Sequence, residues 1–244
     1  MTTQVVDTES AREFMRETLQ KITEAELLAI AGELGGKYER FSALLQRPVR
    51  DRLGADELRR LLRSVFSTRR KAGEVLDRVG APRLAGWIDD LLEPRTALDA
   101  RFQTFYDRLA GLPESVRFDL ASELLHFTDP ERYWLWTRWV WDPHTRTGAL
   151  PLVTMEEYDL DAETVGKTYL RVGQAIAFVH ETGRAAGFTR IGQGPFGVDV
   201  YLACVYCVYV YTTVRMRMTQ EFNRVIPPLP ELARRFLGVY RMEI

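Results

Sequence analysis

The sequence predicts an all-α protein, a single globular domain built from many helices. Apolar side chains recur every three to four residues through most of the 244 positions, which is the spacing of an amphipathic helix. Residues that start and end helices separate these runs. No two strand-like patterns stand out that could pair with each other, so no sheet is expected. These three observations favour a bundle of about eleven helices, for which an orthogonal helix-hairpin-helix arrangement is one candidate.

The composition is that of an ordinary folded protein. The apolar fraction of 46% and the charged fraction of 27% suit a buried core with a charged surface. A net charge of −1 argues against a uniform attraction to nucleic acid or anionic lipid, but it allows a local patch. Two cysteines are too few for a disulfide scaffold, and the N-terminal residues lack a basic start followed by an apolar run. We therefore expect no signal peptide and a cytoplasmic location.

The first helices are marked by their starting residues. Asp7 or Thr8 begins the first helix, and residues 23–26 have the pattern of a capping box, in which a hydroxyl and a carboxylate serve each other's backbone amides. Because glycine often ends a helix, the second helix is expected to stop at Gly35-Gly36. A further helical stretch is then predicted over residues 38–45.

Residues 47–78 are the most basic part of the chain, with ten Arg or Lys against five Asp or Glu, a local balance of +5. Leu58, Leu61 and Leu62 lie on one helical stripe, and the arginines between them point elsewhere. A charged helix face of this kind most often does no more than contact solvent. The alternatives are that it binds nucleic acid or another anion, or that it binds an acidic surface of a partner protein. The candidate residues of such a face are Arg59, Arg60, Arg63, Arg69, Arg70 and Lys71.

Prolines and glycines divide the rest of the chain into helices. Pro82 and Pro94 each precede an apolar helical run. A long helix is expected to start at Asp161 or Thr164 and to end at the glycines of residues 183–187. After a glycine-rich loop over residues 191–197, the chain closes with a long apolar run, a short helix before Pro227-Pro228, and a helix over residues 230–237.

The segment Leu120–Leu150 contains four of the five tryptophans. Each large ring buries about 150–250 Å² when it leaves water, so a tight group of rings is expected to lie in the core. We therefore predict that this segment is a hub on which helices from both ends of the chain dock. One domain over residues 1–244 is expected, and the one subdivision considered lies near residues 151–160.

Near the end of this segment, residues 141–148 read as a loop that holds a carboxylate, an imidazole, hydroxyls and a guanidinium beside an indole. Such a set suits the binding of an anionic ligand, or acid–base chemistry through His144 and Asp142. The alternative is an ordered turn in which Asp142 caps the backbone, an arginine stacks on a tryptophan and His144 is merely exposed. No catalytic residue is assigned. The candidate binding residues are Arg138, Trp141, Asp142, His144 and Arg146.

Residues 198–218 fit two patterns. The end of this stretch alternates as a strand would, but a helical stripe also runs through it, and its length favours a helix. The apolar run Val198–Val214 is expected to be a core helix and not a membrane span, because its tyrosine hydroxyls need hydrogen-bond partners. Cys204 and Cys207 are interpreted as buried core cysteines; a redox pair and two ligands of a metal site are the alternatives. No metal site is predicted.

The run LAGLPESVRFDLASELLHFTDPERYWLW, within residues 109–136, resembles the hairpin region of helix-hairpin-helix DNA glycosylases and their all-helical relatives. The matching pieces include the turn at Leu112-Pro113, Ala121 on the following helix, and Pro130. The resemblance implies two helices joined by a turn that approaches a DNA phosphate. The sequence departs from the family at two places. The turn carries Glu114 where the family has glycine, and Trp136-Thr137 lie about where the family has its catalytic aspartate. The resemblance therefore implies a related scaffold without glycosylase chemistry.

No P-loop, HExxH, GxSxG or strand-linked GxGxxG pattern appears in the sequence. We therefore expect a non-enzymatic helical protein that binds a protein partner or a second copy of itself through aromatic and basic surfaces. The alternatives are a nucleic-acid-binding protein of degenerate hairpin type, and an enzyme with its site around residues 138–146. The sequence indicates no particular cofactor, and no membrane insertion is expected.

Overall fold

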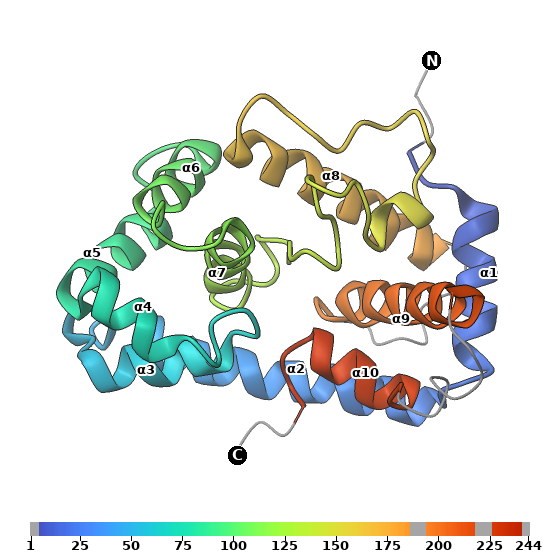
Figure 1. Ribbon diagram of the computed structural model, residues 1–244, viewed down its shortest axis with the longest axis horizontal. Helices are drawn as coiled ribbons and strands as arrows, with labels where there is room; N and C mark the ends of the chain where they lie inside the picture. The colour runs from blue at the N-terminus through green and yellow to red at the C-terminus, as the bar shows by residue number, and fades with distance from the viewer. Residues whose placement is uncertain (1–4, 186–193, 218–225, 241–244) are drawn as a thin grey trace. The chain divides into compact units, whose positions relative to one another are not determined.

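The computed structural model of the protein describes residues 5–185, 194–217 and 226–240 (Figure 1). Over these ranges the regular structure consists of ten α-helices and two short 3₁₀ helices, and the only β-type pairs are two isolated bridges. The prediction of an all-α fold is confirmed.

The chain separates into two compact units, each made of several segments. The central unit holds Gly35–Arg138 and Leu160–Gln174. The terminal unit holds Met1–Leu34, Trp139–Asp159 and Ala175–Ile244. Two long helices, α2 (Glu24–Leu45) and α8 (Val165–Ala185), therefore contribute residues to both units.

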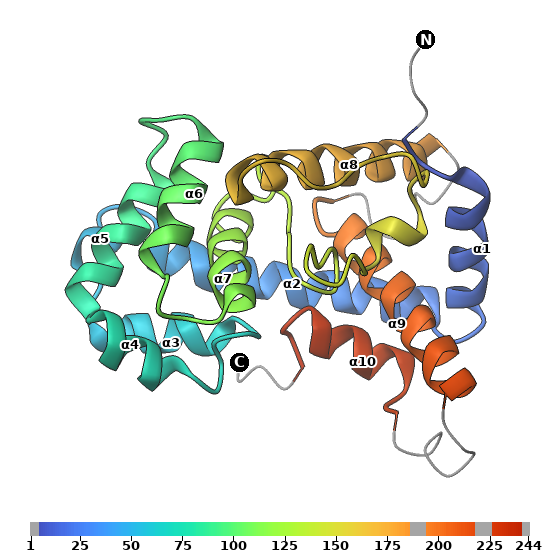
Figure 2. The same ribbon diagram turned by 45° about the horizontal axis from the view of Figure 1, so that its top comes forward.

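In the central unit, the other helices cover α7 (Glu114–His126), in which every residue from Phe118 to His126 is buried. Its aromatic core includes Trp136, whose ring centroid lies 4.6 Å from that of Phe118. The remaining helices of this unit are η1 (Arg50–Arg52), α3 (Ala55–Ser64), α4 (Ala72–Val79), α5 (Ala81–Leu92) and α6 (Leu98–Arg108). Helix α5 contacts α3, α4, α6 and α7, and so holds the unit together (Figure 2).

The sequence signals for these helices act as predicted. Leu58, Leu61 and Leu62 form the buried stripe of α3. Pro82 lies in the first turn of α5, where its missing N–H costs nothing. Near the start of α8, the Thr164 hydroxyl accepts a hydrogen bond from the Lys167 amide at 3.2 Å, as expected of a capping residue.

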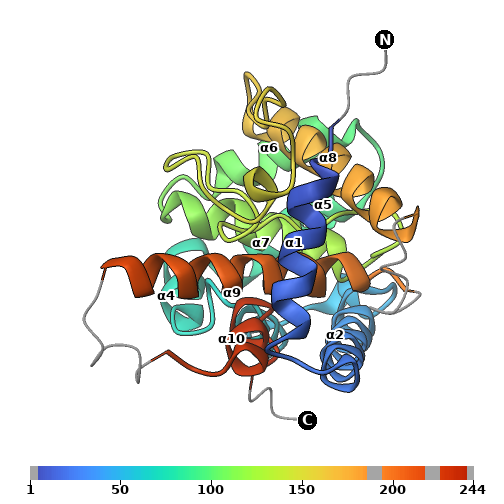
Figure 3. The ribbon, with the colours of Figure 1, turned by 90° about the vertical axis from the view of Figure 1, so that its right-hand side faces the viewer.

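The terminal unit is built around α9 (Gly197–Arg217), which contacts both α1 (Thr8–Leu19) and α10 (Leu229–Phe236). Figure 3 shows α1 crossing α9. The Tyr201 hydroxyl donates to the Ala11 carbonyl at 2.9 Å and ties the two helices together. The unit also contains the short helix η2 (Leu150–Leu152). Asp7 caps α1 by accepting from two backbone amides, which confirms it as a starting residue.

The prediction that a helix ends at Gly35-Gly36 is wrong, because α2 continues through both glycines to Leu45. Each interior glycine costs about 1 kcal/mol relative to alanine. That cost is outweighed by the buried side chains on either side of the pair, among them Leu34 and Phe41. The capping box at the start of α2 is confirmed, since Thr23 and Glu26 each accept a hydrogen bond from the other's backbone amide.

Residues 197–217 form one continuous helix, which settles the choice between strand and helix over that range. Among the described residues, no helix combines the length and the apolar character needed to cross a bilayer. Helix α8 runs past Gly183 to Ala185, so Gly183 does not end it. Gly187, residues 191–193 and most of the stretch before Pro227, where a short helix was predicted, lie outside the described residues.

The four tryptophans of the predicted hub are divided between the units. Trp134 and Trp136 belong to the central unit, and Trp139 and Trp141 belong to the terminal unit. Trp136 is fully buried, while the indole Nε1 of Trp139 donates to the Phe236 carbonyl at 3.0 Å. The expected single hub is therefore replaced by two pairs of indoles, because the chain passes from one unit to the other within the tryptophan segment.

Candidate functional site

The loop at residues 141–148 is an ordered turn held by its own backbone. The Asp142 amide donates to the Thr147 carbonyl at 2.7 Å and closes the loop. The carboxylate Oδ1 of Asp142 accepts from the amides of His144 at 3.0 Å and Thr145 at 3.4 Å. The Asp142 carboxylate is therefore used to fix the turn.

Arg146 occupies the tip of this turn in the left-handed region, with φ at 54°. Its guanidinium carbon lies 5.8 Å from the buried ring of Trp141, and an exposed ion pair joins it to Asp159 at 3.9 Å. An exposed pair at that distance contributes little to stability. Gly148 closes the turn at φ 150°, where a Cβ atom would lie 2.4 Å from the Val140 carbonyl oxygen. Only glycine fits there.

The predicted binding residues thus fall into two groups. Trp141, Asp142, His144 and Arg146 share the turn in the terminal unit, and the His144 side chain is exposed. Arg138 belongs to the central unit, where its backbone amide donates to Asp119 at 3.3 Å. The contacts of the turn are those of the ordered-turn interpretation: a capping aspartate, an arginine over a tryptophan and an exposed histidine.

Cys204 and Cys207 are free and buried in α9, which confirms the core interpretation. Burial raises the pKa of the Cys204 thiol to about 12 and also raises the pKa of Cys207, so both thiols are neutral at physiological pH. Over the described ranges, no cluster of three or more His, Cys, Asp or Glu side chains is placed to hold a metal ion.

The structure divides the predicted basic face into paired and unpaired cations. Arg59 and Arg60 form ion pairs one turn back along α3, at 3.1 Å with Asp56 and 2.9 Å with Glu57. The four remaining cations are exposed: Arg63, Arg69, Arg70 and Lys71. Within the part of the chain that the structure describes, none of Arg63, Arg70 and Lys71 has a carboxylate partner. The positive charge of this face therefore concentrates at residues 63–71, here called the basic loop.

The basic loop is a compact series of turns with one aromatic ring on its outside. Val65 and Thr68 point inward and are fully buried, and the Thr68 hydroxyl donates to the Leu62 carbonyl at 2.6 Å. Phe66, between them, is 53% exposed. The loop contains four cations and no carboxylate. Phe66 could not be recognised from the sequence, because its spacing four residues after Leu62 is that of the buried stripe of α3, which ends at Ser64.

The central unit also buries several titratable groups. Lys37 is fully buried on α2, and its Nζ lies 2.5 Å from the carboxylate of Glu123 on α7. Burial, reinforced by the charge of Glu123, raises the pKa of Asp119 well above its usual value despite the nearby Arg138. His126 is buried too, and its Nδ1 lies 2.7 Å from the Tyr133 carbonyl oxygen. These groups lie inside the unit and not on its surface.

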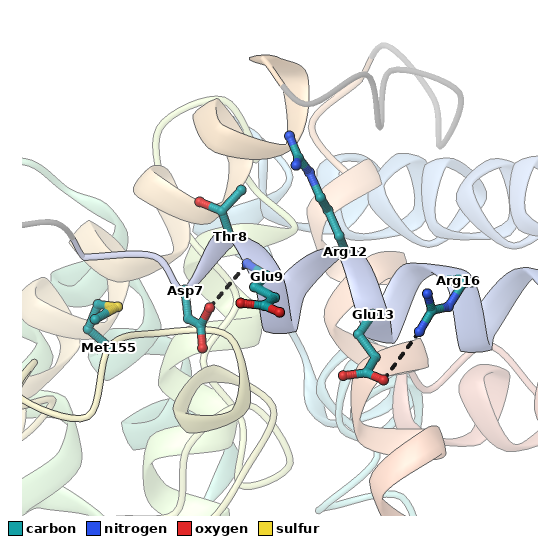
Figure 4. A pocket seen from close by; sticks show the side chains of 7 residues that line it. All are labelled: Asp7, Thr8, Glu9, Arg12, Glu13, Arg16 and Met155. Atoms are coloured by element: carbon teal, nitrogen blue, oxygen red, sulfur yellow. Dashed lines mark hydrogen bonds and ion pairs between the residues drawn. The ribbon is translucent and has the colours of Figure 1, made fainter.

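A large open hollow of about 920 Å³ lies along α1 in the terminal unit (Figure 4). Three of its charged side chains are engaged within the helix itself: Asp7 caps the first turn, and Glu13 pairs with Arg16 at 3.3 Å. Figure 4 shows Arg12 pointing away from the carboxylates of Glu9 and Glu13. The hollow therefore lacks a set of polar groups directed at one point.

Comparison with protein-family models, with curated proteins and with solved structures finds no match for this chain. The function must therefore be inferred from the surfaces and hollows described above. Of these, the basic loop has both concentrated charge and an exposed ring.

Proposed function

We propose that this chain is a binding protein whose basic loop holds single-stranded nucleic acid. The proposal is carried by Phe66, which is 53% exposed in a loop with four cations and no carboxylate. A single exposed ring is ordinary on a protein surface, and what distinguishes Phe66 is the group of cations around it. Cations that neutralise phosphates, placed around a ring that stacks on a base, are the two parts of a single-strand binding surface.

Single strands are favoured over duplexes by the position of the ring. A phenylalanine stacks on an unpaired base for about 1–3 kcal/mol, and this contribution does not depend strongly on which base it is. In a duplex the bases are already stacked on one another, and only the phosphates would be within reach of the loop. The net charge of −1 means that the rest of the surface adds no general attraction, so binding depends on the local patch.

The experiment is a titration of a fluorescent oligothymidine with the protein at about 50 mM and about 200 mM salt. We expect binding that weakens with salt, with a logarithmic slope of about −2 to −3, since each neutralised phosphate of a single strand contributes about −0.7. Phe66→Ala should weaken binding about tenfold or more, because the stack is lost. A duplex of matched length should bind less tightly than the single strand.

A matched control is provided by the paired arginines of α3. The double variant Arg59→Gln, Arg60→Gln removes two positive charges that already have carboxylate partners, whereas Arg70→Gln, Lys71→Gln removes two that have none in the described chain. Only the second variant should lose affinity substantially. Absence of binding at low salt, or equal losses for both variants, would refute the proposal. If polyglutamate bound more tightly than oligothymidine, the basic loop would instead be a surface for an acidic protein partner. Binding to a protein partner is the class of function first expected from the sequence.

A further inference from the structure

The central unit buries an arginine that has no carboxylate partner. Arg101 of α6 is 6% exposed. Its guanidinium donates to the Leu91 carbonyl at 2.6 Å and to the Tyr133 hydroxyl at 2.9 Å. Its Nε–H has no hydrogen-bond partner, and no ion pair to Arg101 exists over the described residues.

The neighbouring groups compensate for only part of this charge. Removing a cation from water costs several kcal/mol even after the protein relaxes. The Leu91 carbonyl lies in the last turn of α5, where the helix dipole is negative, and such a position contributes at most about 2 kcal/mol. A negative charge close to Arg101 would therefore stabilise it further.

Arg101 lines a cavity of about 250 Å³ between α5 and α6, here called the α5–α6 pocket. Trp87, Leu91 and Phe105 supply apolar walls, and Arg95 and Arg108 add two further guanidinium groups. Apolar walls combined with charged groups are found in small-molecule sites, and this cavity is slightly smaller than their usual volume of about 300–1,000 Å³.

Both acidic residues that line the pocket already form ion pairs with arginines. Asp90 pairs with Arg108 at 2.6 Å. Glu93 pairs with Arg47 at 3.1 Å and with Arg50. Among the cations that line the pocket, Arg95 and Arg101 therefore have no carboxylate within ion-pair distance in the described chain.

We infer that the α5–α6 pocket binds a small organic anion. Its carboxylate or phosphate head group lies against Arg101 and Arg95, and its apolar or aromatic body lies against Trp87 and Phe105. Guanidinium groups suit this role because they form paired hydrogen bonds with either kind of head group. The site is separate from the basic loop and does not depend on nucleic-acid binding.

The test uses the full chain and four probes: benzoate, phenyl phosphate, inorganic phosphate and the cation benzylammonium. We expect benzoate or phenyl phosphate to bind with a Kd of about 1 mM or tighter in a calorimetric titration. Inorganic phosphate should bind more weakly because it lacks the apolar body, and benzylammonium should not bind. The tighter of the two aromatic anions identifies the preferred head group.

Two variants test the site without removing the buried Arg101. Arg95→Gln should weaken binding of the preferred probe about tenfold. Thr104→Trp, at an exposed lining position of α6, should block the pocket and abolish binding while it keeps all three guanidinium groups. Arg59→Gln, which alters an arginine of α3 outside the pocket, should bind as the unaltered protein does. No saturable binding of either aromatic anion at tens of millimolar, or undiminished binding by Thr104→Trp, would overturn the inference.

Discussion

Helix α7 and the stretch Tyr201–Val208 of α9 are both mostly buried, but they bury different kinds of polar group. Helix α7 of the central unit places Asp119, Glu123 and His126 along one face, at spacings that bring them onto the same side of the helix. Over Tyr201–Val208, helix α9 of the terminal unit buries Cys204, Cys207 and the hydroxyl of Tyr201. The first turn of α9 also buries Asp199.

The two helices differ in how their buried polar groups are stabilised. Glu123 of α7 requires a cation from another helix, and Lys37 supplies it at 2.5 Å. The two thiols and the Tyr201 hydroxyl are neutral at physiological pH, because burial raises the pKa of Cys204 to about 12 and also raises those of Cys207 and Tyr201. A charged pair in a core is costly to break and a neutral thiol is not. Glu123 of α7 and its partner Lys37 should therefore be far less tolerant of substitution than the two cysteines of α9.

The largest expected effect is that of Lys37→Met, which leaves Glu123 buried without its cation. We expect the free energy of unfolding to fall by about 3–5 kcal/mol, measured by urea denaturation. The double variant Lys37→Met, Glu123→Gln removes both charges and should recover much of that loss. Lys71→Met, at an exposed position, is the matched control and should change stability by less than about 0.5 kcal/mol. A small loss for Lys37→Met would show that the pair does not stabilise the core.

A smaller effect, of opposite sign at neutral pH, is expected for Asp119→Asn. The pKa of Asp119 is raised by burial above its unfolded value of 3.8, so the protonated form stabilises the folded state. That contribution is fully present below pH 3.8 and is lost as the pH rises through the folded-state pKa. Asparagine retains a side-chain oxygen to accept from the Arg138 amide but does not ionise.

We therefore expect Asp119→Asn to be more stable than the unaltered protein by about 1–3 kcal/mol near neutral pH. The difference should shrink as the pH is lowered towards 4, which urea denaturation at a series of pH values measures. Parallel pH profiles for the two proteins would mean that Asp119 ionises in the folded state as easily as in the unfolded one.

The smallest effect is expected in α9. Cys204→Ala removes one buried sulfur atom and breaks no ion pair, so the loss should be about 1 kcal/mol. The same denaturation measurement checks it against Lys37→Met. If Cys204→Ala cost as much as Lys37→Met, the contrast between the two helices would fail. Rapid modification of either thiol in the native protein would also contradict this contrast, because buried and protonated thiols react only after unfolding.

Much of the fold was predictable from local signals. Asp7, Thr164 and Pro82 mark helix starts because caps and prolines act within one turn of the backbone. The course of α2 was not predictable in this way. Gly35 and Gly36 resemble a stop signal, and the burial that overrides it comes from residues distant in sequence, including Glu123.

The candidate sites were harder to predict for the same reason. Sequence analysis identified the basic residues, but it could not tell that Arg59 and Arg60 are paired while Arg63 is not. Arg101 carried no signal at all, because a lone arginine in an amphipathic pattern is assigned to the surface. Its burial depends on the Leu91 carbonyl and on Tyr133, which come together only in the folded chain.

The hydrogen bond between Tyr201 and Ala11 spans 190 positions of the chain and has a consequence for biosynthesis. At about 5–20 residues per second, a ribosome needs about 10–40 s to make the intervening polypeptide. Through that interval α1 has emerged, but its apolar side chains Ala11 and Met15 have no α9 to cover them. The nascent terminal unit therefore leaves this apolar side of α1 exposed to water until α9 has been made, and a chaperone that covers α1 during that interval would raise the yield of native protein.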